Sequence, residues 1–184
     1  CDLIRRRNDL DFTIQDILDQ NVNLSTQEGE GVDVELRYSF ETGIGDFDAA
    51  LLWAHLLDRS KTPRPGAPVQ DLTGTHTSVT AEDGGTYAEN KANFSLHYYN
   101  GDLSVGYLAE YISSVDAPAL FVTYNQPVDS IVYHDLVFDY TLDALGETKL
   151  TAGFTNLTDE EPPYIDPGFN ATTDPNTYRM FGRG

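Results

Sequence analysis

The sequence predicts an all-β fold, and its pattern favours an antiparallel transmembrane β-barrel fragment. Several segments of the 184-residue chain alternate strictly between apolar and polar residues, as half-buried strands do. Short and long connections alternate along the chain. No apolar run reaches the roughly 18 residues of a membrane helix, but barrel strands need only about 9–11 residues, half of which face the lumen.

Seven strands are expected, and the first, over residues 32–41, shows the pattern clearly. Val34, Leu36, Tyr38 and Phe40 are apolar, whereas the residues between them are polar. The other predicted strands cover residues 45–58, 86–99, 102–114, 128–142, 147–157 and 176–184. The stretch 47–57 is apolar on both faces, so its sequence does not show which side chains face the core side of the sheet.

The expected connections set a topology. Short ones lie at 41–45, 99–102 and 143–147, and Asn100-Gly101 predicts a type I′ hairpin turn because both residues tolerate positive φ. Long ones occupy 58–87, 114–128 and 158–177. Outer-membrane barrels have short periplasmic turns and long extracellular loops, whereas we expect a β-sandwich to mix its loop lengths. Residues 1–31 are then an extracellular loop, with a small hairpin or helical turn at 12–19.

The charge balance excludes one class of function. The formal net charge is -19 and the isoelectric point is about 4.2, so the chain lacks the basic surface of a generic nucleic-acid binder. The acidic residues cluster in expected turns and loops or beside them. The simpler interpretation of these acidic clusters is that they are solvated loops. The alternative is that their negative charge attracts cationic or metal-bearing ligands toward the protein.

Tyrosines are frequent in the expected strands, several of them near strand ends. They indicate aromatic girdles at the two membrane interfaces, where a ring meets apolar chains and its hydroxyl meets water. The alternative is the general preference of aromatic residues for strands.

No enzymatic motif is present: the chain contains no G-x-S-x-G, H-E-x-x-H, Walker or C-x-x-C pattern. We therefore expect no catalysis, no cofactor and no metal centre. Of the four histidines, His97 and His134 are expected as satisfied wall residues, and His76 lies in a long loop. Asp166, Asn170 and Asp174 offer oxygen ligands for calcium, but their spacing is not that of an EF-hand and an ordinary polar loop is preferred.

The C-terminal stretch carries the most specific pattern. A short alternating strand from Leu150 runs into Asn156-Leu157-Thr158-Asp159, followed by Pro162-Pro163-Tyr164, then Asp174-Pro175-Asn176-Thr177-Tyr178 and Phe181-Gly182-Arg183. This order resembles the last two strands of TonB-dependent outer-membrane receptors, which have a G-x-x-N-L-x-D strand, a P-P-Y loop, a D-P-x-x-Y segment and a final G-R strand.

The resemblance implies that residues 1–184 are the C-terminal portion of a receptor barrel, the last seven or so of about 22 strands. The plug domain would lie outside this chain. Family members end in an aromatic residue, whereas this sequence ends Phe181-Gly182-Arg183-Gly184, so we expect both ends to be truncated. The lone Cys1 fits an internal position in a longer chain, with a lipidated N-terminus as the alternative.

The implied function is active import across the bacterial outer membrane. An extracellular ligand, either a small molecule such as a siderophore or cobalamin or an oligosaccharide, would bind the loops, and the TonB–ExbB–ExbD complex would act through the missing plug. The barrel would contact outer-membrane lipid and no nucleic acid. Candidate ligand contacts, chosen as aromatic or polar side chains in long loops, are His76, Tyr124, Tyr164 and Phe169.

Two other classes stay open. One is a different outer-membrane barrel, either a passive porin or a barrel shared between chains. The other is a soluble secreted β-sandwich binding module, anchored as a lipoprotein through Cys1. Loop-length alternation disfavours the sandwich, and the C-terminal motif disfavours the porin.

Overall fold

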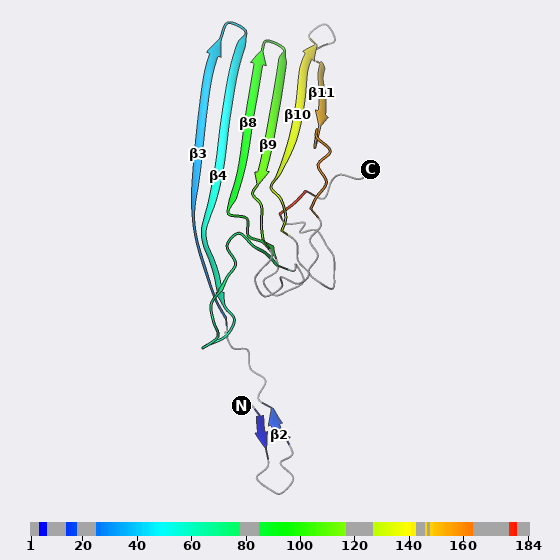
Figure 1. Cartoon of the computed structure of the whole chain (residues 1–184). Helices are drawn as coiled ribbons and strands as arrows, with labels where there is room; N and C mark the ends of the chain where they lie inside the picture. The colour runs from blue at the N-terminus through cyan, green and yellow to red at the C-terminus, as the bar shows by residue number, and fades with distance from the viewer. Residues whose placement is uncertain are drawn as a thin grey trace.

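The computed structural model describes residues 4–6, 14–17, 25–77, 85–116, 127–142, 146, 148–163 and 177–179. Six long strands form one antiparallel sheet, in which strands that follow one another along the chain lie side by side (Figure 1). In spatial order they are β11 (Thr148–Phe154), β10 (Ile131–Leu142), β9 (Leu103–Ile112), β8 (Asn90–Asn100), β4 (Gly45–Thr62) and β3 (Thr26–Thr42). The predicted all-β antiparallel fold is confirmed for these residues.

The sheet has a seventh strand, but it is not the predicted one. The two-residue β5 (Gln70–Asp71) pairs with the end of β4. The strand expected at 176–184 is described only at 177–179, and these three residues are not in a strand. Two further pairs lie outside the sheet: β6 (His76–Thr77) with β7 (Gly85–Thr86), and β1 (Ile4–Arg6) with β2 (Ile14–Ile17).

Of the segment 12–19, where a small hairpin or helical turn was expected, the structure describes residues 14–17, which form β2 and pair with β1 upstream of that segment. No helix occurs among the described residues, and so none there is long and apolar enough to cross a membrane.

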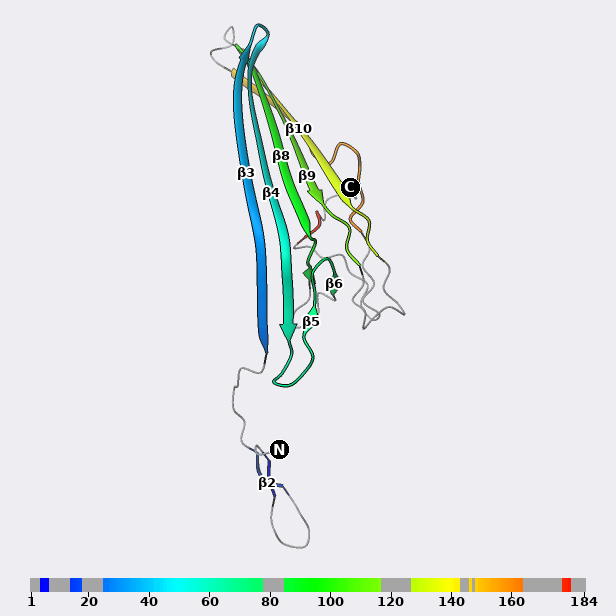
Figure 2. The same cartoon turned by 60° about the vertical axis from the view of Figure 1, so that its left-hand side comes forward.

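The β3–β4 hairpin is longer than predicted. It pairs without interruption from Thr42↔Gly45 to Thr26↔Thr62, apart from one bulge beside Gly31. Alternation of apolar and polar residues begins only near Val32, so the strand was predicted to start there. The backbone ladder continues because each strand supplies the other's hydrogen-bond partners whatever the side chains are. Figure 2 shows this hairpin running on past the ends of β8 and β9.

The β8–β9 hairpin turns one residue later than predicted. Asn100 still pairs with Leu103, so the two turn residues are Gly101 and Asp102. Only Gly101 has positive φ, at 57°. A glycine with positive φ at the first central position fits a type II′ turn, not the predicted type I′. The dipeptide signal located the hairpin correctly and misplaced its register by one residue.

The strand register sorts the side chains into two faces, because directly paired residues project to the same side of a sheet. One line of partners runs Leu36↔Leu51↔Phe94↔Ala109↔His134 across five strands. The neighbouring line runs Arg37↔Ala50↔Ser95↔Leu108↔Asp135. Most apolar positions of each strand therefore fall on one side and most polar positions on the other.

We call the first side the apolar face. Its members are Val32, Val34, Leu36, Tyr38 and Phe40 of β3; Phe47, Ala49, Leu51 and Trp53 of β4; Ala92, Phe94, Leu96 and Tyr98 of β8; Leu103, Val105, Tyr107, Ala109 and Tyr111 of β9; Val132, Leu136, Phe138 and Tyr140 of β10; and Leu150, Ala152 and Phe154 of β11. None of them is buried, and Tyr38 is 68% exposed.

The opposite side is the polar face. It carries Asp33, Glu35, Arg37 and Ser39 of β3; Asp46 and Asp48 of β4; Lys91, Asn93, Ser95 and His97 of β8; Ser104 and Glu110 of β9; Asp135 and Asp139 of β10; and Lys149 and Thr151 of β11. The register also resolves the run 47–57: Leu51 belongs to the apolar face and Leu52 to the polar face.

The two histidines predicted as wall residues occupy opposite faces. His134 lies on the apolar face, where its Nδ1 is 2.7 Å from the Tyr107 hydroxyl. His97 lies on the polar face and stacks against Tyr99 with ring centroids 6.3 Å apart. The expected satisfied polar contact is thus found for His134.

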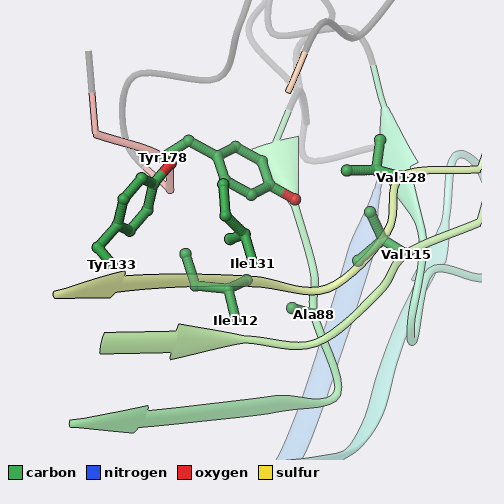
Figure 3. Packing of buried hydrophobic residues seen from close by; sticks show 7 residues of the cluster. All are labelled: Ala88, Ile112, Val115, Val128, Ile131, Tyr133 and Tyr178. Atoms are coloured by element: carbon green, nitrogen blue, oxygen red, sulfur yellow. The ribbon is translucent and has the colours of Figure 1, made fainter. Parts of the chain in front are cut away.

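Buried apolar residues gather at the loop end of the sheet. Figure 3 shows this cluster: Ile112, Ile131 and Tyr133 come from the polar-face positions of β9 and β10, and Ala88, Val115, Val128 and Tyr178 come from the connecting segments. The Tyr178 side chain reaches over Ile131 (Figure 3). The core therefore lies between the sheet and its loops, not over the apolar face.

Gly45, at the turn between β3 and β4, is expected to tolerate no side chain. Its φ is 139°, and an added Cβ would overlap the carbonyl oxygen of Tyr99 and the ring of Tyr98. Gly45→Ala should therefore destabilise the protein by on the order of 3 kcal/mol. Gly43→Ala is the matched control, because no atom lies within 4 Å of its added Cβ. Equal denaturant midpoints for the two variants would contradict this account.

Candidate ligand-facing surface at the loop end of the sheet

The described loop segments form one layer over the loop end of the sheet. Backbone bonds join the first long loop to the second: Asp116 N donates to Gly74 O at 2.8 Å, and His76 N donates to Asp116 O at 3.0 Å. Val115 and Val128 exchange both backbone bonds within the second loop. Backbone hydrogen bonds thus hold the two loops together. Their side chains are therefore fixed relative to the polar face of the sheet.

A cavity of about 260 Å³ opens beneath this layer. Its floor is the polar face where Asp33, Ala54 and Lys91 pair across three strands, and its roof is the segment 86–88. The floor offers one carboxylate and one ammonium group. The volume lies just below the range of about 300–1,000 Å³ typical of ligand pockets, so it suits part of a ligand or a single small group.

Arg59 contacts Tyr87, one of the residues that line the cavity. Its guanidinium is 5.3 Å from the centroid of the Tyr87 ring, and its Nη2 donates to Gln27 Oε1 at 2.6 Å. The Leu56 backbone N–H donates to the Glu89 carbonyl at 2.8 Å, which holds the roof segment against β4. A stacked and hydrogen-bonded arginine is a fixed positive group in an otherwise acidic chain.

His76, a candidate ligand contact, lies inside the loop layer. It forms β6 with Thr77, its partner in the ladder is Thr86, and its side chain is only 1% exposed. A ligand at the outer surface of the loops does not reach it in this conformation. A ligand role for His76 stays a prediction that requires the layer to open.

The other three candidate contacts, Tyr124, Tyr164 and Phe169, lie outside the described residues. The same holds for Asp166, Asn170 and Asp174, the oxygen ligands considered for calcium. Within the part of the chain that the structure describes, no group of three or more His, Cys, Asp or Glu residues is arranged to hold a metal ion.

The C-terminal motif meets the sheet at a charged cluster on the polar face. The guanidinium of Arg179 binds both carboxylate oxygens of Asp135, at 2.7 and 2.8 Å, and Glu110 Oε2 at 2.8 Å. It also lies 5.1 Å from the centroid of the Tyr133 ring. The next residue back, Tyr178, is 2% exposed. We call Arg179, Asp135 and Glu110 the arginine cluster.

The charge state of this cluster follows from its contacts. Partial burial by itself lowers the pKa of Arg179, but the hydrogen bonds to Asp135 and Glu110 outweigh that effect, and the net pKa is raised. The arginine therefore remains charged, with its Nη1 shared between the two Asp135 oxygens and its Nε donating to Glu110.

Asp135 also binds the N-L-x-D part of the motif. Its Oδ1 accepts the backbone N–H of Asn156 at 2.9 Å. Asn156 has φ of 53°, which asparagine tolerates, and its side-chain amide both donates to the Glu160 carbonyl and accepts from the Glu160 N–H, each at 3.0 Å. The described ends of the two motif segments thus converge on one carboxylate.

Sequence reasoning did not anticipate Asp135 or Glu110 as binding partners. Both occupy ordinary polar positions in alternating strands, and Arg179 is 44 and 69 residues away from them. The only local signal was an arginine directly after the D-P-x-x-Y segment in a chain with 11 Lys and Arg residues against 30 Asp and Glu residues.

Comparisons with family models, with curated proteins and with solved structures gave no match for this chain.

Proposed function

We propose that this chain is the C-terminal part of the barrel wall of a TonB-dependent outer-membrane receptor. In this proposal the sheet supplies about seven of some 22 transmembrane strands, and a plug outside the chain fills the lumen. An extracellular siderophore, cobalamin, oligosaccharide or similar ligand is imported by force from the TonB–ExbB–ExbD complex.

One observation carries the proposal: a six-stranded sheet has an uncovered apolar face and a polar opposite face. A water-soluble sheet packs its apolar side against another layer, yet no member of the apolar face is buried. Lipid is the solvent in which such a face is stable. The two edges, β3 and β11, require further strands in the membrane, because unpaired backbone groups are not tolerated in hydrocarbon.

Loop geometry and the C-terminal motif support the same proposal. The described loops fold toward the polar face, which becomes the lumen of the proposed barrel, and the cavity beneath them lies where a ligand would enter. The arginine cluster gives the N-L-x-D and D-P-x-x-Y segments a shared role in fixing the last loop to β9 and β10.

Adjacent leucines provide a sharp test of the barrel. Leu51 and Leu52 are equally apolar, but the register places them on opposite faces. In the intact receptor in outer-membrane lipid, a nitroxide at Leu51→Cys should collide with oxygen and not with a water-soluble nickel complex, and a nitroxide at Leu52→Cys should show the reverse. Water accessibility at both positions would refute the membrane assignment.

Import needs a separate test. A strain without the gene is compared with its complemented parent for uptake of labelled ferric siderophores, cobalamin and oligosaccharides. We expect uptake of one class to be lost on deletion of the gene and equally on deletion of TonB. Uptake that depends on the gene but not on TonB would indicate a passive porin.

A further inference from the structure

Two opposite charges line the cavity under the loop layer, and neither is neutralised by a neighbour. They are the Asp33 carboxylate of β3 and the Lys91 ammonium group of β8. Among the described residues, neither side chain forms an ion pair or a side-chain hydrogen bond, with the other or with a third residue. A few charged groups that converge on a partly apolar cavity are the usual means by which a protein orients a ligand.

The strand register holds these two charges apart. Asp33 pairs with Ala54, and Ala54 pairs with Lys91, so a whole strand lies between them. Because neighbouring strands are about 4.8 Å apart, the α-carbons of Asp33 and Lys91 are about 10 Å apart. The side chain between them is a single methyl group. The floor of the cavity is therefore a short apolar step with a carboxylate on one side and an ammonium group on the other.

The roof of the cavity is held from both sides. Gly74 N donates to the Tyr87 carbonyl and Tyr87 N donates to the Thr75 carbonyl, each at 2.9 Å. Farther along the chain, Asn90 N donates to Ser113 Oγ at 3.0 Å. Because these bonds exist without a ligand, little ordering of the roof is needed when a ligand binds, and that lowers the cost of binding.

The charges favour one class of ligand over two others. An anion is repelled by Asp33 and by the net charge of -19, although it suits Lys91. A simple cation is attracted by the chain as a whole but repelled locally by Lys91. A zwitterion has no net charge to be repelled and can satisfy both groups at once.

The spacing of the charges sets the length of this zwitterion. An ion-pair contact of about 2.8 Å at each end of the 10 Å gap leaves about 4–6 Å between the two charged groups of the ligand, since a lysine stem can lean either way. This separation is larger than that in an α-amino acid. It matches an amino acid with one or two additional methylene groups, or the two ends of a dipeptide.

We propose that the cavity binds a zwitterionic aminocarboxylate, with its ammonium group on Asp33 and its carboxylate on Lys91. The inference rests on the proposed function, in which the cavity lies in the barrel lumen beneath extracellular loops. It narrows the imported ligand to a molecule with separated ammonium and carboxylate ends, either a short unblocked peptide or a free ω-amino acid. The spacer between those ends lies over Ala54.

A series of ligands of graded length tests the spacing. Isothermal titration calorimetry on the intact receptor compares glycine, β-alanine, 4-aminobutyrate, 6-aminohexanoate and diglycine. We expect glycine and 6-aminohexanoate to bind roughly tenfold more weakly than the best intermediate member, because each can make only one of the two charged contacts. Tightest binding by diglycine would identify a peptide, and tightest binding by β-alanine or 4-aminobutyrate a free amino acid. Affinity independent of length, or equal binding of acetate, would overturn the proposal.

Substitutions test the two charges. Asp33→Asn and Lys91→Gln should each weaken binding of the best ligand by roughly ten- to a hundredfold, the scale of a lost charge-assisted hydrogen bond. The matched controls are Asp48→Asn and Arg37→Gln, which remove charges of the same sign from the polar face outside the cavity and should have no effect.

Exchanging the charges separates binding from a structural role. The double variant Asp33→Lys, Lys91→Asp keeps one charge of each sign on the floor, so a reversed ligand can make both contacts. We expect it to recover most of the affinity that either single variant loses. A double variant as weak as the single variants would overturn the assigned contacts.

The outcomes also separate this proposal from the receptor assignment. If the Leu51 nitroxide contacts water, the receptor assignment fails, and calorimetry still decides whether the cavity binds an aminocarboxylate. If that nitroxide lies in lipid but no member of the series binds, or binding persists without Asp33 and Lys91, only the ligand assignment fails.

Discussion

In the proposed receptor, Leu96→Arg is expected to destabilise the membrane-inserted barrel by about 2–4 kcal/mol, the cost of a cation on the lipid side near the midplane. Leu96 lies on the apolar face near the middle of β8, paired with Ala49 and Tyr107. An arginine there has no water and no counter-charge within the strand, and its side chain is too far from either end of β8 to reach the interface at low cost.

Ser95→Arg is the matched control for this variant. It lies one residue away at the same depth, introduces the same side chain and the same change in net charge, and projects to the polar face. It should alter stability by about 0.5 kcal/mol or less. Reversible urea unfolding in phospholipid vesicles measures both. Equal effects of the two arginines would mean that the apolar face is not in contact with lipid.

Arg179→Leu should destabilise the loop end of the sheet by about 2–3 kcal/mol, the usual scale for losing charge-assisted hydrogen bonds. The substitution leaves the Asp135 and Glu110 carboxylates next to each other without a counter-charge, and it removes the cation from the Tyr133 ring. Arg179→Lys should recover only part of the loss, because one ammonium nitrogen does not reproduce the separate Nη1 and Nε bonds to the two carboxylates.

Arg37→Leu is the control for the cluster. Its side chain is 79% exposed, and its ion pair with Glu35 lies in solvent, so removing it should change stability by less than about 1 kcal/mol. A double-mutant cycle with Asp135→Asn isolates the coupling between Arg179 and its main partner. A coupling energy no larger than that of the Arg37–Glu35 pair would contradict the assigned role of the cluster.

Much of the architecture follows from the sequence because the period-2 signal is local. The alternation in 32–41 and its counterparts located the long strands other than β4, the apolar run 47–57 located β4, and Asn100-Gly101 located a hairpin. Boundaries were less certain where the signal was weak. The outer part of β3 has glycines and charges in place of alternation, and pairing with β4, not propensity, makes it a strand.

The candidate site was less predictable than the strands. His76 was chosen as a polar residue in a long loop, and only the fold places it inside the loop layer at 1% exposure. The arginine cluster joins residues from β9, β10 and the C-terminal segment, and nothing local to Asp135 distinguishes it from Asp139 on the same face. Because the partners are 44 or more residues apart in the sequence, no local sequence pattern could predict these contacts.

The sequence by itself determined the strand content, the alternation of short and long connections and the existence of one apolar and one polar side. Tertiary structure alone decided how those sides are assembled. Leu51 and Leu52 are chemically identical, and the cross-strand register sends one to each face. The same register brings Trp53, His55 and Asn90 together and places Asp135 under Arg179. The physical reason is that pleating is a local property of each strand, whereas register is fixed by backbone pairing between segments far apart in the chain.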